Sequence, residues 1–183
     1  MLRAADELPS VPLAAVDSHS KIAIIQNMAR FDVNAAPRLI RAARLDAGLT
    51  QAQLAERAGV RQPSLAQMES GSRAISAQML QRVLQAADYR PSVPLAANAE
   101  RVVECARARG LGRPRVFGSA MRGDDCFDSD IDLLVTPSET ADLLDLALFG
   151  HEVEELTGFP TEVVCDTAVP PALAQAVREA VPL

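Results

Sequence analysis

Aromatic side chains are scarce in this sequence, which has no tryptophan, one tyrosine and five phenylalanines. The interior must therefore be filled mainly by Leu, Val, Ile and Ala. Hydrophobic residues still make up 49% of the chain, enough to form a core and to exclude disorder throughout. The length of 183 residues allows one ordinary domain or two small ones.

Cysteines are few and far apart. Cys105, Cys126 and Cys165 have no partner at the short spacing of a metal site, and an odd count of this kind is typical of a reducing compartment. No apolar run approaches the roughly 20 residues of a membrane helix. Asp6 and Glu7 interrupt any signal-peptide pattern at the start. We therefore expect a cytoplasmic protein with no membrane association.

Charge is unevenly distributed along the chain, whose formal net charge is −6. Residues 1–97 contain eleven basic and eight acidic residues, whereas residues 98–183 contain seven basic and sixteen acidic ones. Two halves of opposite sign indicate two domains with different partners. The acidic half would repel nucleic acid unless metal ions intervened.

The hydrophobic pattern predicts an all-α bundle followed by a small α/β (α+β) domain with a mixed sheet. Residues 1–35 form an arm of uncertain structure, in which 22–25 fit a short strand or a helical turn. Residues 36–90 form the bundle, 91–97 a linker and 98–183 the second domain. In that domain, helices are expected near 98–109, 139–156 and 170–180, and strands near 115–117, 131–136 and 161–165.

The first domain contains the stretch LTQAQLAERAGVRQPSLAQMESGSRAISAQML, residues 49–80. It resembles a helix-turn-helix domain of the phage-repressor (Xre/Cro) type: Thr50 opens the first motif helix, Gly59 makes the tight turn and Leu65 anchors the next helix. The resemblance implies binding to operator DNA as a homodimer on a two-fold site. The alternative is a four-helix bundle that makes only protein contacts.

A second helix that projects beyond such a turn can enter the major groove and present its first side chains to the bases. Pro63 stands where many relatives have a polar residue, so fewer side chains of this helix could read bases. The residues expected at base edges are Arg61, Gln62, Ser64 and Gln67, and those expected at phosphates are Gln51, Ser70 and Arg73.

The second domain contains two carboxylates crowded at the start of an apolar run. Asp130 and Asp132 are two positions apart, so on a strand they point to the same face, roughly 6–7 Å apart. The apolar residues Ile131, Leu133 and Val135 would point into a core. Two anions so close are costly to desolvate, and a divalent cation such as Mg²⁺ resolves the conflict.

The turn before these carboxylates has the composition of a phosphate-binding loop. Gly118 allows close approach of a ligand to the backbone, and backbone N–H groups beside Ser119 can hold a phosphate. Arg122 adds a positive charge in the same loop. A phosphate-binding turn followed by a metal-binding pair is typical of nucleotide chemistry.

The order Gly-Ser, ten residues and Asp-x-Asp resembles the signature of the nucleotidyltransferase superfamily of DNA polymerase β type. The segments Gly-Ser-Ala-Met-Arg-Gly and Ser-Asp-Ile-Asp-Leu-Leu-Val are similar to those of its minimal nucleotidyltransferases. The resemblance implies ATP as substrate, held by Gly118, Ser119 and Arg122, and two Mg²⁺ ions. It implies that the catalytic and metal-binding residues are Asp130, Asp132 and Glu162.

Two positions depart from the family pattern. Glu162 stands where relatives commonly have Asp, with Asp166 as a fallback, and Ala120 stands where many relatives carry Arg.

Other acidic residues have simpler interpretations. A calcium loop beginning at Asp128 would need Gly at position 133, which is Leu. We expect Asp124, Asp125 and Asp128 to form a solvated loop.

The family resemblance implies an antitoxin of a toxin–antitoxin system. Such a protein would repress its own operon and neutralise its cognate toxin by transferring AMP to a toxin hydroxyl. The alternative is a DNA-binding antitoxin whose degenerate nucleotidyltransferase domain acts by binding only, which Glu162 and Ala120 motivate. A third hypothesis, an enzyme that modifies tRNA ends, is disfavoured by the acidic second half.

Overall fold

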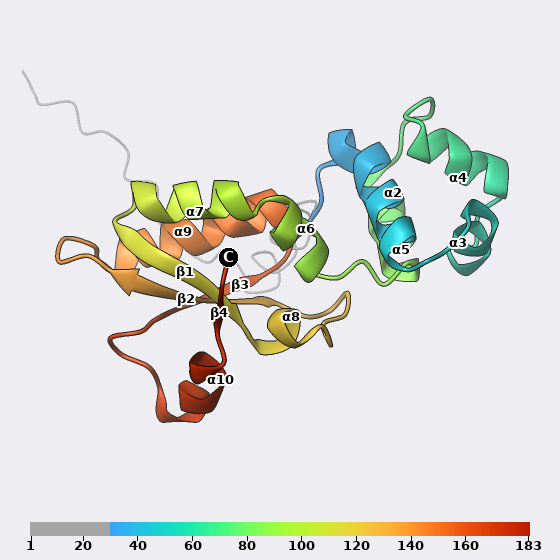
Figure 1. Ribbon diagram of the computed structural model, residues 1–183. Helices are drawn as coiled ribbons and strands as arrows, with labels where there is room; N and C mark the ends of the chain where they lie inside the picture. Colours follow the sequence, from blue (N-terminus) through green and yellow to red (C-terminus); the bar gives the residue numbers. More distant parts are fainter. Residues whose placement is uncertain (1–29) are drawn as a thin grey trace, which may run out of the picture.

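The computed structural model describes residues 30–183, and it confirms the predicted fold class: a helical region followed by an α/β region with a mixed four-stranded sheet. We call residues 30–97 the helical half and 98–183 the α/β half (Figure 1). The strand or helical turn expected at 22–25 lies outside the described residues. Within 30–183, no helix combines the length and apolar character of a membrane span.

Short helices with clear end signals form the helical half. Thr50 caps α3 in a capping box with Gln53, Pro63 lies in the first turn of α4, and the Ser76 side chain caps α5. Their apolar faces meet in a core whose fully buried members include Ile40 and Leu84. The elements are η1 (Val33–Ala35), α2 (Ala36–Asp46), α3 (Gln51–Arg57), α4 (Gln62–Glu69) and α5 (Ala77–Ala86).

The segment predicted as a linker, residues 91–97, is mostly helical. It forms α6 (Ser92–Ala97), and Pro94 lies within this helix. Pro94 and Leu95 are buried, and α6 packs against α2 on one side and against α7 (Ala99–Ala108) and α9 (Leu143–Thr157) on the other. This segment therefore joins the two halves through packing as well as through the chain.

The sheet has the strand order β3-β2-β1-β4. β1 runs antiparallel to both β2 and β4, whereas β2 and β3 are parallel, so the sheet is mixed. Pairing sets Asp132 of β2 opposite Phe117 of β1 and Glu162 of β3. The strands are β1 (Leu111–Phe117), β2 (Ile131–Pro137), β3 (Thr161–Cys165) and β4 (Val181–Pro182), and α8 (Gly118–Arg122) follows β1 directly.

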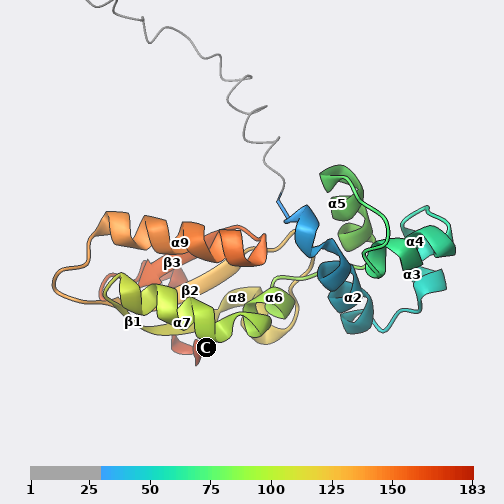
Figure 2. The ribbon, with the colours of Figure 1, turned by 90° about the horizontal axis from the view of Figure 1, so that it is seen from above.

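Helices cover both faces of the sheet. α7 and α9 lie side by side over one face, and η2 (Pro171–Leu173) and α10 (Ala174–Arg178) lie on the other (Figures 1 and 2). α9 begins at Leu143 and not near residue 139, because the Asp142 carboxylate accepts hydrogen bonds from the first-turn N–H groups. The last helix ends early, and the chain then adds β4, which the sequence pattern did not predict.

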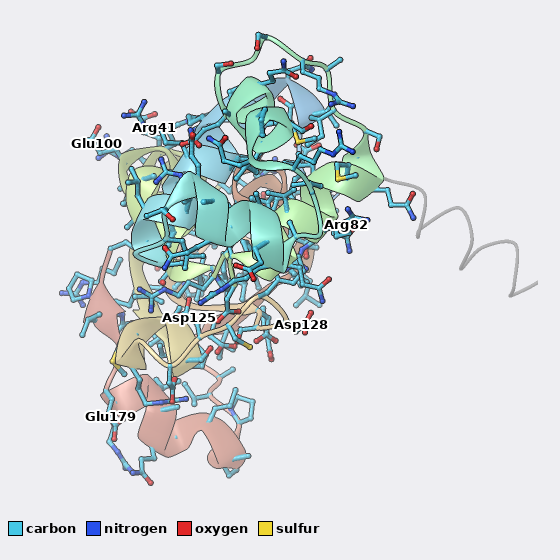
Figure 3. The ribbon with its side chains drawn as sticks, turned by 90° about the vertical axis from the view of Figure 1, so that its right-hand side faces the viewer. Arg41, Arg82, Glu100, Asp125, Asp128 and Glu179 are labelled. Carbon is cyan, nitrogen blue, oxygen red and sulfur yellow. The ribbon has the colours of Figure 1, made fainter. Side chains whose placement is uncertain are left out.

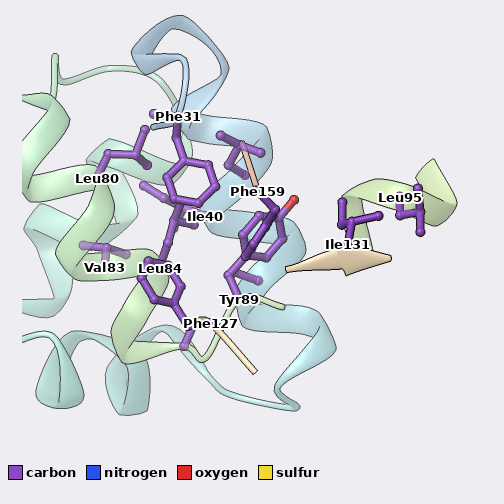
Figure 4. Packing of buried hydrophobic residues seen from close by; sticks show 14 of the residues in the cluster. Phe31, Ile40, Leu80, Val83, Leu84, Tyr89, Leu95, Phe127, Ile131 and Phe159 are labelled. Carbon is purple, nitrogen blue, oxygen red and sulfur yellow. The ribbon is translucent and has the colours of Figure 1, made fainter. Parts of the chain in front are cut away.

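Aromatic rings join the two halves (Figure 4). In the helical half, Phe31 packs on Phe127 and Phe159 of the α/β half, and Tyr89 packs on Phe159, with ring centroids 5.6–6.1 Å apart. The Arg30 guanidinium lies over the rings of Phe127 and Phe159 at 4.6 and 4.4 Å. These contacts merge the cores of both halves into one continuous cluster.

Replacing Phe31 by Ala should lower the free energy of unfolding by about 3–5 kcal/mol, because a ring that is 5% exposed would leave a cavity between the halves. Chemical denaturation monitored by circular dichroism measures this loss. Val33→Ala is the control, since Val33 is 37% exposed and its truncation should cost little. Equal losses for the two variants would contradict the packing role assigned to Phe31.

Candidate active site

The sheet register gathers three carboxylates at one place. Asp132 and Glu162 are paired across β2 and β3, and Asp130 precedes Asp132 by two positions. Each of the three offers an oxygen, and these oxygens lie within 4.8 Å of one another. Asp130 and Glu162 are exposed, whereas Asp132 is half-buried. The extra methylene of Glu162 therefore does not keep its carboxylate away from the two aspartates.

Gly118 fits tightly against this cluster. Its φ is +69°, and a Cβ at this position would lie 1.9 Å from Oδ2 of Asp132. Only glycine permits both that conformation and that approach. The contact brings the start of α8, with the backbone of Ser119, next to the carboxylates, as the predicted phosphate-binding turn requires. Ser119 itself is half-buried, and α8 ends at Arg122, just before Gly123.

The electrostatics of the cluster centre on Asp132. Burial, together with the nearby charges of Asp130 and Glu162, raises the pKa of Asp132 to about 6, and Arg122 opposes the shift. Within residues 30–183, no Lys or Arg lies within salt-bridge distance of the three carboxylates. The negative charge is thus left for a cation to neutralise.

A divalent cation with oxygen ligands fits this donor set. Mg²⁺ binds one or two carboxylates, retains several waters and takes the remaining ligands from phosphate. Three converging carboxylates beside a turn without a Cβ offer that combination. Asp166 does not belong to the cluster, because its Oδ2 accepts hydrogen bonds from Arg115 at 2.6 Å and from Thr136 at 2.5 Å.

The loop between α8 and β2 differs from the solvated loop expected for it. Asp124 and Asp128 are exposed, and Asp124 pairs with the predicted phosphate ligand Arg122 at 3.2 Å. The expectation was wrong for Asp125, which is 5% exposed at the boundary between the halves (Figure 3). Its Oδ2 accepts a hydrogen bond from the backbone N–H of Ser92 at 2.7 Å. Nothing in the sequence around Asp125 indicates that Ser92 is its partner.

The residues predicted to bind DNA gather around α3 and α4. Nε2 of Gln62 donates to Oε1 of Gln51 at 3.2 Å, and the Arg73 guanidinium donates to the Ser64 hydroxyl at 3.3 Å. Gln51 and Ser64 are half-buried, whereas the other five residues are exposed: Arg61, Gln62, Gln67, Ser70 and Arg73. The pairs link the start of α3 to the start of α4, and the turn after α4 back to α4.

One residue that orients this surface was not predicted. Arg44 of α2 forms an ion pair with Glu69 at 2.6 Å, and Glu69 also accepts a hydrogen bond from Gln51 at 2.9 Å. Burial opposes the ionised form of Glu69, but its hydrogen bonds to Arg44 and Gln51 lower its pKa overall. Arg44 and Glu69 are 25 positions apart, so helical periodicity could not pair them.

Each half of the chain matches a known protein family. A helix-turn-helix family model matches residues 40–93, and a nucleotidyltransferase domain model matches residues 100–181. A candidate protein adenylyltransferase of Methanocaldococcus jannaschii is 38% identical over 64 residues, which are 35% of this chain and 69% of that protein. A solved candidate minimal nucleotidyltransferase is 38% identical, covering 52% of this chain and 98% of its own, with a TM-score of 0.47.

The raised pKa of Asp132 makes stability depend on pH. The folded metal-free protein holds this proton more tightly than the unfolded chain, so it loses stability as pH rises from the ordinary value of 3.8 to about 6. Asp132→Asn removes that loss. In EDTA, the melting temperature of Asp132→Asn minus that of the original protein should therefore be larger at about pH 8 than at about pH 4.

Glu139→Gln is the control, because Glu139 is exposed and lies outside the carboxylate cluster. Thermal unfolding by circular dichroism measures all three proteins at both pH values. If the difference between Asp132→Asn and the original protein were the same at both, the carboxylates would not be competing for one proton.

Proposed function

Because the chain belongs to the nucleotidyltransferase domain family and carries a helix-turn-helix domain before that domain, we propose that it is a DNA-binding antitoxin that adenylylates its toxin. In this proposal the α/β half transfers AMP from ATP to a hydroxyl of the toxin, and the helical half represses the operon that encodes both. The observation that carries the proposal is the cluster of three carboxylates against Gly118.

We assign each site residue one role. Asp130, Asp132 and Glu162 would hold Mg²⁺. When bound there, the ion would neutralise phosphate charge and lower the pKa of an attacking hydroxyl. Gly118 leaves room for the nucleotide at the backbone, and the N–H groups beside Ser119 would hold its phosphates. Arg122 is exposed and would exchange its contact with Asp124 for a phosphate oxygen.

The transfer balances without an added oxidant or reductant. The oxygen of the acceptor hydroxyl forms a bond to the α-phosphorus of ATP, and the bond between that phosphorus and the α–β bridging oxygen breaks. Pyrophosphate leaves with the electron pair, and the hydroxyl proton passes to solvent. The protein contributes by positioning the reactants and neutralising charge.

The identity of the acceptor is inferred from the relatives and from the size of the domain. The Methanocaldococcus jannaschii relative is named as a protein adenylyltransferase, which favours a protein hydroxyl as acceptor. The α/β half is too small to include a separate acceptor-binding domain, so the partner must present its own hydroxyl. The acidic charge of this half disfavours a nucleic-acid acceptor.

For the helical half, we propose that a homodimer binds a two-fold operator with α4 in the major groove. The exposed Arg61, Gln62 and Gln67 would reach base edges together with Ser64, and Arg73 and Gln51 would contact phosphates. Support comes from the helix-turn-helix match and from the position of these residues around α3 and α4.

The second candidate function is binding without catalysis. Ala120 stands where many members of the resembled family carry Arg, so a charge that would help to hold the triphosphate is missing. Under this alternative, the double variant Asp130→Asn/Asp132→Asn would still neutralise the toxin. Growth rescue of cells that express the toxin separates the two functions, because neutralisation by adenylylation requires both carboxylates.

Asp130→Asn should lower AMP transfer to the toxin by about a hundredfold or more, because it removes charge that holds the ion while leaving the strands intact. Incubating toxin, ATP and Mg²⁺ with the protein, followed by intact-mass analysis, measures the gain of one AMP unit. Glu179→Gln is the control and should transfer normally, because Glu179 is exposed at the C-terminal end of α10. Full transfer by Asp130→Asn would refute catalysis by this cluster.

The DNA-binding residues should separate into two kinds. Arg73→Ala should weaken binding equally for all sequences and lower the salt dependence by about one unit of slope. Gln62→Ala should cost about 1–3 kcal/mol for the preferred site and relax its specificity. Fluorescence anisotropy with a duplex selected by this chain from a random pool measures both effects.

Arg107→Ala in the α/β half is the matched control for the loss of one positive charge. If that variant weakened DNA binding as much as Arg73→Ala does, the DNA surface would not be confined to the helical half.

A further inference from the structure

We infer that the helical half positions the metal-binding carboxylates by holding the loop that leads to them. This loop, residues 123–130, joins α8 to β2 and ends at Asp130; we call it the acidic loop. The inference rests on the proposed metal and nucleotide site. It assigns Asp88, Arg90 and Ser92, with Arg30, as positioning residues for a reaction that takes place in the other half.

The backbone of Phe127 in the acidic loop is bound on both sides by the helical half. Its N–H donates to Oδ1 of Asp88 at 2.8 Å, and its C=O accepts from Nη2 of Arg30 at 3.0 Å. The Phe127 ring packs against Phe31 at 6.1 Å between centroids. Main-chain and side-chain contacts together fix this residue, which is three positions from Asp130.

Asp125 forms a second anchor. Its side chain is fully buried, and Oδ2 accepts the backbone N–H of Ser92 at 2.7 Å. Oδ1 has no hydrogen-bond partner among residues 30–183, and Nη1 of Arg90 lies 3.7 Å away. A buried carboxylate is stable only when paired, so its position depends on the helical half.

Arg90 connects this anchor to the end of α2. Its Nε donates to Asp46, the last residue of α2, at 2.9 Å, and its Nη1 also reaches the carbonyl oxygen of Gly123 at 3.5 Å. The same guanidinium thus touches α2, the start of the acidic loop and the neighbourhood of Asp125. Hydrogen bonds from one half therefore restrain three separate points of the loop.

The restraints on the acidic loop act on the carboxylate at its end. Asp130 is exposed and lies within 4.8 Å of two other carboxylates, so repulsion favours its moving away when no cation is present. Within residues 30–183, the Asp130 carboxylate has no positively charged side chain within 4.0 Å. The anchored loop keeps this carboxylate in the cluster and so prepares the site for a cation.

Asp88 offers a test that separates positioning from folding, because its φ is +52°, a left-handed conformation. Asp88→Gly removes the carboxylate and suits this conformation better than the original residue. Asp88→Asn keeps an oxygen that can accept from Phe127 and also tolerates the conformation. Val83→Ala is the matched control for lost stability, since Val83 is buried in α5 of the helical half.

The probe is Mn²⁺ alone, bound to the full chain and measured by electron paramagnetic resonance. Asp88→Gly should weaken Mn²⁺ binding about fivefold or more, in the range of typical coupling between sites. Asp88→Asn should stay within about twofold of the original protein. Val83→Ala should keep its affinity at a temperature where the variant remains folded by circular dichroism.

Each other result overturns the inference. Unchanged affinity in Asp88→Gly would show that the loop does not need its anchor, and an equal loss in Val83→Ala would assign the effect to general stability. Asp130→Asn tests the site itself: if the original protein bound Mn²⁺ no better than this variant, the proposed function would fail together with the inference. A loss in Asp130→Asn without a loss in Asp88→Gly would remove the inference alone.

Discussion

The strand register brings like charges together, and the rest of the α/β half is arranged around that constraint. Three carboxylate oxygens lie within 4.8 Å, although each pair repels. The opposite face of β2 supplies the compensation, since Ile131, Leu133 and Val135 are completely buried. The apolar side of one strand thus fixes its acidic side, and the missing Cβ of Gly118 lets the next turn come close.

The features of this arrangement that depend on residues close together in the chain could be predicted from the sequence. A spacing of two positions places Asp130 and Asp132 on one face of any strand, and the Gly118-Ser119 pair just after an apolar run favours a turn. Glu162 was identified through family resemblance, and the parallel pairing of β2 with β3 then sets it opposite Asp132. The four-helix pattern was readable for the same reason, because caps and glycines act within a few positions.

Contacts between distant residues could not be predicted in this way. Asp125 looks like any loop carboxylate until Ser92 and Arg90 are placed beside it. Arg30 looks like a surface charge, yet it lies over aromatic rings from the far end of the chain. A strand as short as β4 has no alternation to detect, and Pro94 reads as a breaker although it lies inside a helix.

The joint between the halves limits how freely either can be exchanged. A chimera that took the helix-turn-helix unit from another protein, cut after residue 97, would lose the partners of Phe127 and Asp125, because both anchors come from the transplanted side. A working graft would therefore need matched residues on both sides of the boundary between the two halves.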